Sequence, residues 1–455
     1  MPSFDEYFSP GKRGYLIGVG GVSMAPLAEV LNDRGLIISG SDIQMSEKVR
    51  ELMGRGIHVN IGHRAENITP ELDFIVRTAA VRDENPEIRA AHEKGIPVFE
   101  RAQAWGTIMR GYRNALCIAG THGKTTTTSM CTHILMAAEK DPTVMIGGTL
   151  PLLHAGHRVG QGDTIVLESC EYYDSFLSFY PTVAVILDVD ADHLDYFSGL
   201  DAVKASFRKF ASLVPQDGVV IVSRDDENAM DSVRGLSRHI VTFGLTEDAD
   251  IRAVNILQRG AHTEFDVLDH GRLLAHLNLS VPGIHNVKNA LAATAAAITL
   301  NISPMAVTYG LAGFRGANRR FEFKGKFNGA DIYDDYAHHP SELKALLDAV
   351  EPLGYKRTIL VFQPHTYSRT YALLGDFAEQ LKRPDLTYLA EIYAAREKNT
   401  IGISSADLAE KIPNSLFFPT FPELEKALRF TVAPGDLVLT VGAGDVYRIG
   451  EALTE

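Results

Sequence analysis

The chain has 455 residues, of which 45% are apolar and 22% charged, and this composition is typical of a globular protein with a large core. Its formal net charge of -13 argues against a general binder of nucleic acid or membrane surfaces. Three scattered cysteines favour a reducing compartment, and the polar start of the chain lacks the apolar core of a signal peptide. We therefore expect a soluble cytoplasmic protein of two to four domains.

Short β-rich runs alternate with helical patterns along the first 113 residues. Strands are predicted at 15–19, 36–39, 74–77 and 98–99, and helices at 25–34 and 86–94. Alternation of this kind indicates a parallel sheet covered by helices.

The same rhythm returns twice. From residue 114, strands are predicted to begin at Leu116, Thr143, Thr164, Val183, Val219 and Ile240, followed by a meander at 251–257, 263–268 and 273–279 and a helix at 286–300. From residue 319, strands near Asp331, Thr358, Leu386, Leu416 and Leu437 alternate with helices near Ser341, Thr370, Ser404 and Pro422. We predict three α/β domains at 1–113, 114–318 and 319–455. The first and third are expected to be Rossmann-like, and the central one to be a P-loop ATPase-type parallel sheet with a small antiparallel meander.

A glycine-rich loop follows the strand that begins at Leu116. Gly120 and Gly123 allow backbone N–H groups to surround phosphate oxygens, and the helix that follows directs its positive end at the same anion. Lys124 is suited to the β- and γ-phosphates, and Thr125 to Mg²⁺. Only two residues separate the glycines, against four in the general pattern. The loop predicts that the chain binds ATP.

A second glycine turn, Gly18 to Met24, lies between a strand and a helix, and Asp42 follows the next strand. The pattern resembles a dinucleotide-binding fingerprint in which Asp42 is near the place of a ribose partner. Ser23 stands where the third glycine is expected. Binding of NAD(P), binding of another nucleotide diphosphate and a plain tight turn remain open on this evidence.

Acidic and histidine side chains follow two further strands. Glu168 directly ends one strand and is therefore favoured over Glu171 as a Mg²⁺ ligand. The loop from Asp188 to Asp195 carries four aspartates around His193, and a cation would relieve their repulsion. His193 is suited to act as a metal ligand or as a proton acceptor.

The remaining constellations lie further along the chain. Asn286 and Asn289 share one face of a helix, where their amides suit an adenine edge or simply cap the helix. The runs 334–340 and 362–369 supply His, Arg and acidic groups for a small amino-acid-like substrate, with Arg369 suited to its carboxylate.

Taken together, these residues resemble the Mur ligase family of peptidoglycan synthesis over almost the whole chain. The resemblance also includes the run His285-Asn286 and the run 319–322, Arg-Arg-Phe-Glu. The opening at Gly18 to Met24, the pairs Ser41-Asp42 and Arg101-Ala102, and the two third-domain runs are most similar to the branch that joins L-alanine to UDP-N-acetylmuramate.

The resemblance implies an ATP- and Mg²⁺-dependent amide-forming ligase that releases ADP and phosphate. The lactyl carboxylate of UDP-N-acetylmuramate would accept the γ-phosphoryl group of ATP, and the amine of L-alanine would attack the resulting acyl phosphate. The three domains would bind the UDP-sugar, ATP and the amino acid in chain order. We expect a cytoplasmic monomer or weak homodimer that acts on small molecules in cell-wall synthesis, without a nucleic-acid or membrane partner.

The resemblance also assigns site residues. The ATP site would comprise Gly120, Thr121, His122, Gly123, Lys124, Thr125, Thr126, His285, Asn286, Asn289, Arg319, Arg320 and Asp335. The UDP-sugar site would comprise Gly18, Gly20, Gly21, Ser23, Asp42, His63 and Thr78, and the amino-acid site Tyr336, His338, His365 and Arg369. Metal ligands would be Thr125, Glu168 and His193. Lys124 would be catalytic, and His193 and His338 are alternatives for the base.

Three positions depart from the family pattern. Thr366 stands where the better-known ligases of this branch carry arginine, and Cys170 removes a carboxylate from the run 168–171. Phe207 stands where several other branches carry a carbamylated lysine, so none is expected here.

Four other functions compete with this one. A recycling ligase that joins a whole tripeptide to UDP-N-acetylmuramate shares the nucleotide motifs, and a folylpolyglutamate-type synthase lacks a comparable first domain. An NAD(P)-dependent Rossmann oxidoreductase would leave the Lys124 loop unexplained. A non-catalytic ATP-binding module would bind nucleotide without forming an amide.

Overall fold

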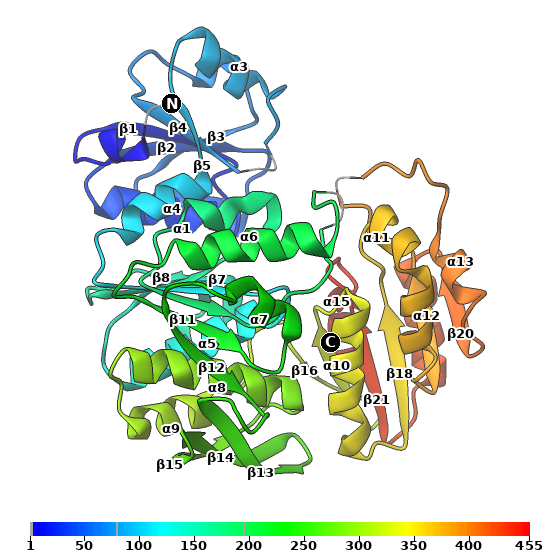
Figure 1. Ribbon diagram of the computed structural model, residues 1–455. Coiled ribbons are helices and arrows are strands. Elements are labelled where there is room, and N and C mark those ends of the chain that lie inside the picture. The colour runs from blue at the N-terminus through cyan, green and yellow to red at the C-terminus, as the bar shows by residue number, and fades with distance from the viewer. Residues whose placement is uncertain (1–2, 79–80, 194–195, 396) are drawn as a thin grey trace. The chain divides into compact units, whose positions relative to one another are not determined.

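The computed structural model describes residues 3–78, 81–193, 196–395 and 397–455. The described strands form three sheets of five, ten and six strands (Figure 1). Their contacts divide the chain into two compact units. The first comprises Met1–Arg252, Leu268–Arg272 and Ala290–Gly310, and the second Ala253–Val267, Leu273–Asn289 and Leu311–Glu455. No helix among the described residues has both the length and the apolar character needed to cross a membrane.

The first sheet is parallel throughout, in the order β3-β2-β1-β4-β5. Its strands are β1 (Arg13–Ile17), β2 (Ile37–Asp42), β3 (His58–Ile61), β4 (Phe74–Arg77) and β5 (Val98–Glu100). Its helices are α1 (Met24–Asp33), α2 (Glu47–Gly54), α3 (Pro86–Glu93) and α4 (Arg101–Met109). The chain reverses its strand order on either side of β1, which is where sheets of this kind present their ligands.

The second sheet has the order β15-β14-β13-β12-β11-β10-β6-β9-β7-β8. Its strands are β6 (Asn114–Ala119), β7 (Thr143–Leu150), β8 (Ala155–Arg158), β9 (Thr164–Glu168), β10 (Val183–Ile186), β11 (Val219–Ser223), β12 (His239–Gly244), β13 (Ile251–Arg259), β14 (His262–Asp269) and β15 (Arg272–Leu279). Its helices are α5 (Lys124–Ala137), α6 (Leu200–Ser212), α7 (Glu227–Val233), α8 (Ile284–Thr299) and α9 (Pro304–Gly313). The strands β10, β6 and β9 are parallel neighbours, whereas β8 pairs with β7 in the antiparallel sense.

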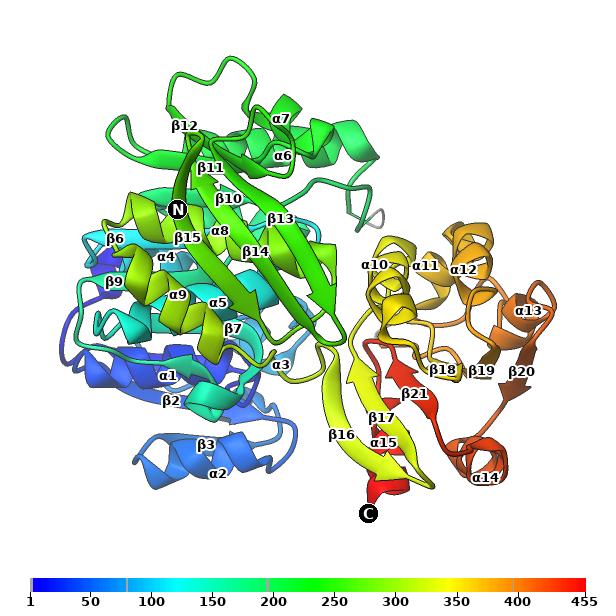
Figure 2. The same cartoon turned by 90° about the horizontal axis from the view of Figure 1, so that it is seen from below.

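The third sheet has the order β16-β17-β21-β18-β19-β20, and only β16 runs antiparallel to its neighbour (Figure 2). Its strands are β16 (Glu322–Phe327), β17 (Ala330–Asp335), β18 (Arg357–Phe362), β19 (Leu386–Ala390), β20 (Ser415–Phe418) and β21 (Asp436–Val441). Its helices are α10 (Pro340–Val350), α11 (Tyr367–Ala372), α12 (Leu374–Leu381), α13 (Ser405–Ala409), α14 (Phe421–Thr431) and α15 (Tyr447–Thr454).

The predicted α/β alternation is confirmed in all three sheets, and the meander is present as β13, β14 and β15. The strand expected at 15–19 ends earlier, because Gly18 has a φ of +76° and begins the turn. The strands β3, β8 and β16 were not predicted. Each is a short or partly polar edge strand, so its sequence carries little of the apolar signal that marks buried strands. The three domain boundaries stay a prediction.

Helix α4 packs the first sheet against the second within the first compact unit. Trp105 and Ile108 on α4 are buried in the same apolar core as Phe176 and Phe210. The helix approaches so closely that a Cβ at Gly106 would lie 2.0 Å from the carbonyl oxygen of Ser178. A glycine is therefore required at this position by space alone.

This contact predicts the effect of two matched glycine substitutions. Gly106→Ala should destabilise the protein by about 1–3 kcal/mol, because backbone rather than a flexible side chain must move. Gly54→Ala, at the end of α2, meets nothing within 4 Å and should be neutral or stabilising by up to about 1 kcal/mol. Urea unfolding of both variants measures the difference. Equal effects would contradict the proposed packing of α4.

Candidate functional site

The loop after β6 has the geometry of an anion site. Gly120 has a φ of +150° and Gly123 a φ of +79°, and Gly123 directly precedes α5. A Cβ at Gly120 would also lie 2.8 Å from the Cβ of Leu187 and 2.9 Å from Oδ1 of Asp188. Both conformation and space therefore require glycine, and the first N–H groups of α5 are left to point at a bound anion.

Lys124 is the first residue of α5 and is largely buried. Its Nζ donates to the carbonyl oxygens of Gly120 and Thr121 and lies 3.0 Å from Oε2 of Glu171. Burial alone would lower the pKa of Lys124. The negative charge and hydrogen bond of Glu171 outweigh this effect, so the pKa of Lys124 lies above its ordinary value. The side chain is therefore a permanent cation at the start of the helix.

Glu168 ends β9, and Thr125 faces it from the first turn of α5. The Thr125 hydroxyl donates to Oε1 of Glu168 at 3.1 Å, and the N–H of Gly147 donates to Oε2 at 2.7 Å. The two residues thus combine a carboxylate with a hydroxyl beside the phosphate loop. Oxygen donors of this kind are the ligands that Mg²⁺ prefers, so the residues fit that ion.

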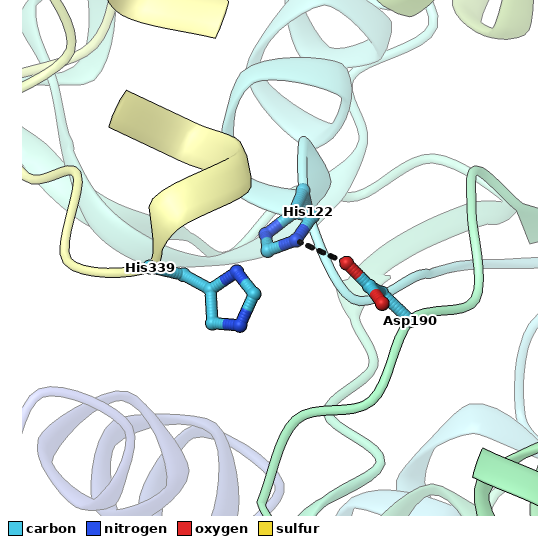
Figure 3. Close-up of side chains that lie close together, drawn as sticks. All are labelled: His122, Asp190 and His339. Atoms are coloured by element: carbon cyan, nitrogen blue, oxygen red, sulfur yellow. Dashed lines mark ion pairs between the residues drawn. The ribbon is translucent and has the colours of Figure 1, made fainter. Parts of the chain in front are cut away.

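The loop after β10 closes over the same glycine loop. Asp188 accepts the N–H of His122 at 2.8 Å, and Thr121 accepts the N–H of Asp190 at 2.9 Å. His122 Nε2 also lies 3.9 Å from Oδ2 of Asp190 (Figure 3). Burial raises the pKa of Asp188 to about 6. The sequence-predicted acidic loop and the phosphate loop therefore lie together, as the neighbouring strands β10 and β6 require.

His193 lies in this acidic loop with a φ of +53°, a strained conformation for a residue other than glycine. Its ring stacks on Tyr172 at 4.4 Å, and Nε2 lies 3.7 Å from Oε1 of Glu171. Glu171, which the sequence ranked below Glu168, thus lies between Lys124 and His193. Asp195, also predicted for this loop, lies outside the described residues.

The glycine turn after β1 is shaped by Asp42. Oδ2 of Asp42 accepts the N–H of Gly20 at 2.9 Å, and a Cβ at Gly20 would lie 2.7 Å from Val49. The turn therefore needs glycine at this position. Ser23 precedes α1, and its hydroxyl accepts a hydrogen bond from Arg101.

His63 and Thr78 complete the predicted UDP-sugar residues. His63 follows β3 and contacts Glu87 and Ser41 through Nδ1, and Thr78 directly follows β4. All seven predicted residues therefore lie at or just beyond the carboxyl ends of β1, β2, β3 and β4, along one edge of the parallel sheet.

The start of α8, in the second compact unit, holds His285, Asn286 and Asn289. Asn289 Nδ2 donates to Oδ1 of Asn286 at 3.3 Å, and Asn286 Nδ2 donates to the carbonyl oxygen of Pro282 at 2.7 Å. Both amides are buried. Burial lowers the pKa of His285 to about 4, so its imidazole is neutral near pH 7.

Arg319, Arg320 and Asp335 lie in the same unit. Asp335 ends β17 and accepts the N–H groups of Phe321 and Ala337 at 2.7 and 2.8 Å, and burial raises its pKa to about 6. Arg319 binds Asp334 and the carbonyl oxygens of Gly442 and Gly444. The guanidinium of Arg319 is thus engaged within the protein, which leaves Arg320, 5.1 Å from the Tyr336 ring, better suited to an external anion.

The four predicted amino-acid-site residues form a continuous chain of contacts after β17 and β18. The ring of Tyr336 lies 5.4 Å from that of His338, and His338 lies 5.7 Å from His365. His365 Nδ1 lies 3.2 Å from Nη1 of Arg369. The structure therefore brings together residues that are up to 33 positions apart in the sequence.

Sequence reasoning missed several residues of these sites. Glu87 contacts His63, Tyr172 stacks on His193, and Tyr393 stacks on His365 at 5.8 Å. Arg101 was noted in the sequence only as part of the resemblance, and its contact with Ser23 was not predicted. None of them lies in a glycine-rich or histidine-rich run. No sequence signal marks them, and the buried carboxylate of Glu87 in α3 becomes apparent only in the structure.

The neutral state of His285 is directly testable. Ring ¹⁵N NMR should show His285 titrating near pH 4, whereas exposed His270, whose pKa is raised by its hydrogen bond to Asp269, should titrate above 6.5. Because the folded pKa of His285 is lowered, its contribution to stability is present above pH 6.5. That contribution is lost as the pH falls toward 4, by about 3 kcal/mol. A midpoint for His285 near 6.5 would contradict this environment.

Three family models match the chain in order. They are described as the Mur ligase family catalytic domain at residues 14–113, the Mur ligase middle domain at 118–297 and the Mur ligase glutamate ligase domain at 319–444. The three matches follow the three sheets in chain order, with only Arg13 of β1 and residues 114–117 of β6 outside them among the described strands.

Relatives and solved structures agree with these models. UDP-N-acetylmuramate–L-alanine ligases from Caldanaerobacter subterraneus and Agathobacter rectalis are 45% and 46% identical to the chain. The matches cover 98% of this chain and 97% and 98% of those proteins. The crystal structure of the UDP-N-acetylmuramate–alanine ligase of Thermotoga maritima superposes with a TM-score of 0.81 at 29% identity, covering 97% of this chain and 98% of that one. A murein peptide ligase from Psychrobacter arcticus, 23% identical, shares the fold with a TM-score of 0.74 over 97% of this chain and 98% of that one. The chain belongs to the Mur ligase family.

Proposed function

We propose that this protein is an ATP-dependent ligase that joins the lactyl carboxylate of UDP-N-acetylmuramate to L-alanine, with release of ADP and phosphate. The observation that carries the proposal is the cluster at the ends of β6 and β9, where Lys124, Thr125 and Glu168 lie beside a glycine loop. Full-length relatives at 45% and 46% identity carry the name of this activity.

The first half of the reaction brings two anions together, because the carboxylate must approach the γ-phosphate of ATP. Lys124 and the N–H groups at the start of α5 offset that repulsion. Thr125 and Glu168 would hold Mg²⁺, which when bound neutralises phosphate charge at this position. Transfer of the phosphoryl group to the carboxylate gives an acyl phosphate, from which phosphate leaves when the amine attacks.

The second half requires the amine of L-alanine to lose a proton. Arg369 is suited to the alanine carboxylate, with Tyr336, His338 and His365 around it. His193 and His338 remain alternatives for the base. Nδ1 of His338 lies 3.0 Å from the carbonyl oxygen of Tyr336 and 3.3 Å from Glu342, so its Nε2 is the nitrogen that would accept the proton.

The nucleotide would be held from two further places. Asn286, Asn289, His285 and Asp335 are assigned to the adenosine, and Arg320 rather than Arg319 to the phosphates. The UDP-sugar would bind along the carboxyl edge of the first sheet, where the Asp42-braced turn presents backbone N–H groups to the diphosphate.

These assignments extend to the organisation of the protein. The domains 1–113, 114–318 and 319–455 would bind the UDP-sugar, ATP and L-alanine in turn. We place the enzyme in the cytoplasm, as a monomer or weak homodimer without nucleic-acid or membrane partners. The negative net charge supports the absence of such partners.

The decisive assay measures phosphate release from ATP and Mg²⁺ with UDP-N-acetylmuramate, with and without L-alanine. Release should require both substrates, and the sugar nucleotide should gain the mass of one alanyl residue. Turnover with the tripeptide but not with L-alanine would favour the recycling ligase instead. NADH oxidation without phosphate release would favour the oxidoreductase.

Lys124→Ala should reduce turnover at least about 100-fold, because the variant loses the side-chain cation that donates to the carbonyl oxygens of Gly120 and Thr121 in the phosphate loop. Its circular dichroism should remain that of the parent. Lys204→Ala is the matched control, since Lys204 is also partly buried beside a carboxylate, that of Asp231, but lies on α6. Ligation that survives in Lys124→Ala would refute the role of the loop.

Glu168→Gln tests the proposed ion site. The amide still accepts the Gly147 N–H but lacks the negative charge, so the Mg²⁺ concentration for half-maximal activity should rise at least about tenfold. Glu227→Gln, an exposed acidic residue at the start of α7, should leave this concentration unchanged. An unaltered Mg²⁺ requirement in Glu168→Gln would exclude Glu168 as a ligand.

A further inference from the structure

The carboxylate of Glu87 lies buried behind the predicted UDP-sugar edge of the first sheet. The residue is fully buried on α3, and each of its oxygens receives two side-chain contacts. Oε1 accepts from the Tyr15 hydroxyl at 2.9 Å and from Asn67 Nδ2 at 2.6 Å. Oε2 accepts from the Ser41 hydroxyl at 2.6 Å and lies 2.9 Å from Nδ1 of His63. All four acceptor positions of the carboxylate are therefore used.

These donors come from three different strand regions. Tyr15 lies in β1, Ser41 in β2, and His63 and Asn67 in the segment after β3. Asn67 also donates to the carbonyl oxygen of Gly62 at 3.1 Å, so it holds the backbone next to His63. One buried anion thus fixes both the ring of His63 and the loop that carries it.

The network also selects the tautomer of His63. The Ser41 hydroxyl gives its hydrogen to Glu87, so its oxygen, 3.0 Å from Nδ1 of His63, is an acceptor. Glu87 is an acceptor as well. Nδ1 must therefore carry a proton, and neutral His63 then has a bare Nε2 on the opposite side of the ring.

We propose that Glu87 is a positioning residue for nucleotide-sugar binding, which holds His63 so that Nε2 accepts a hydrogen bond from a hydroxyl or ring N–H of the nucleotide. The proposal rests on the proposed function, because the ligand is the UDP-sugar of that reaction. Around bound metal ions, a carboxylate commonly accepts the ring N–H of a histidine whose other nitrogen binds the metal, and it thereby fixes the tautomer and the orientation of the ring. Glu87 and His63 have the same arrangement. Glu87 itself does not touch the ligand.

The test combines binding with the state of the ring. Glu87→Gln offers one acceptor and one N–H₂ donor in place of the carboxylate, so the fraction of His63 in the Nε2–H tautomer, which can accept from the amide, should rise. Ring ¹⁵N NMR of the free protein should show this change. The Kd of UDP-N-acetylmuramate, measured by calorimetry, should rise about tenfold, with the Kd of ATP unchanged. Glu87→Asp, which retains the carboxylate, should keep the parental tautomer and separates loss of charge from loss of fold.

Two comparisons exclude a purely structural role. Glu29→Gln removes another buried carboxylate, which lies on α1 at 3.1 Å from His157, and should leave the Kd of the UDP-sugar unchanged. In a His63→Ala background, Glu87→Gln should add no further loss of affinity, because Glu87 acts through His63.

Additive effects of the two substitutions, or an unchanged tautomer in Glu87→Gln, would overturn the proposal. If the parent protein and Glu87→Gln bind UDP-N-acetylmuramate with equal affinity, this inference alone is overturned. Parent protein that fails to bind UDP-N-acetylmuramate would overturn the proposed function together with it.

Discussion

The buried ion pair between Lys124 and Glu171 is the interaction on which the rest of the site depends. Removing a cation from water costs several kcal/mol, and at the start of a helix the dipole adds to that cost. Glu171 offsets it from the loop after β9, and its other oxygen approaches His193. The cation is therefore held beside the phosphate loop. The same contacts fix the loops after β6, β9 and β10 relative to one another. Those loops are held at the ends of adjacent parallel strands, β10, β6 and β9.

The first sheet also has a buried charge whose partners come from several loops and strands, but there the charge is negative. There the buried group is the Glu87 carboxylate, and neutral or protonatable side chains from three strand regions surround it. In the second compact unit, Arg319 lies just before β16 and donates to the carbonyl oxygen of Gly442. Asp335 ends β17 and accepts the N–H of Phe321. Each sheet therefore carries a polar network at one edge, and each network includes or contacts residues that we assign to the proposed reaction.

The sequence was sufficient for the turns whose geometry depends on local spacing. Gly120, Gly123, Lys124 and Thr125 occur within six residues, and Gly18, Gly20 and Gly21 within four, and the structure places each group between a strand and a helix. The position of Glu168 at the end of a parallel strand also predicted that it would lie beside that loop, where Thr125 contacts it. It did not predict that Glu171 rather than Glu168 would bind Lys124, because neighbouring residues at a strand end point in different directions. The sequence indicated neither the burial of Glu87 nor the contact of Arg101 with Ser23, because the partners of these two residues are 20 to 78 residues away.

In the proposed mechanism, the substrate carboxylate is activated by phosphorylation beside Lys124 before the amine attacks. UDP-N-acetylmuramate labelled with ¹⁸O in its lactyl carboxylate tests this claim most directly. Mass spectrometry of the phosphate released during turnover with L-alanine should find one ¹⁸O atom transferred per turnover, because the acyl phosphate breaks at the carbonyl carbon. Phosphate that contains no label would show that the carboxyl oxygen never bonds to phosphorus, and would contradict the mechanism.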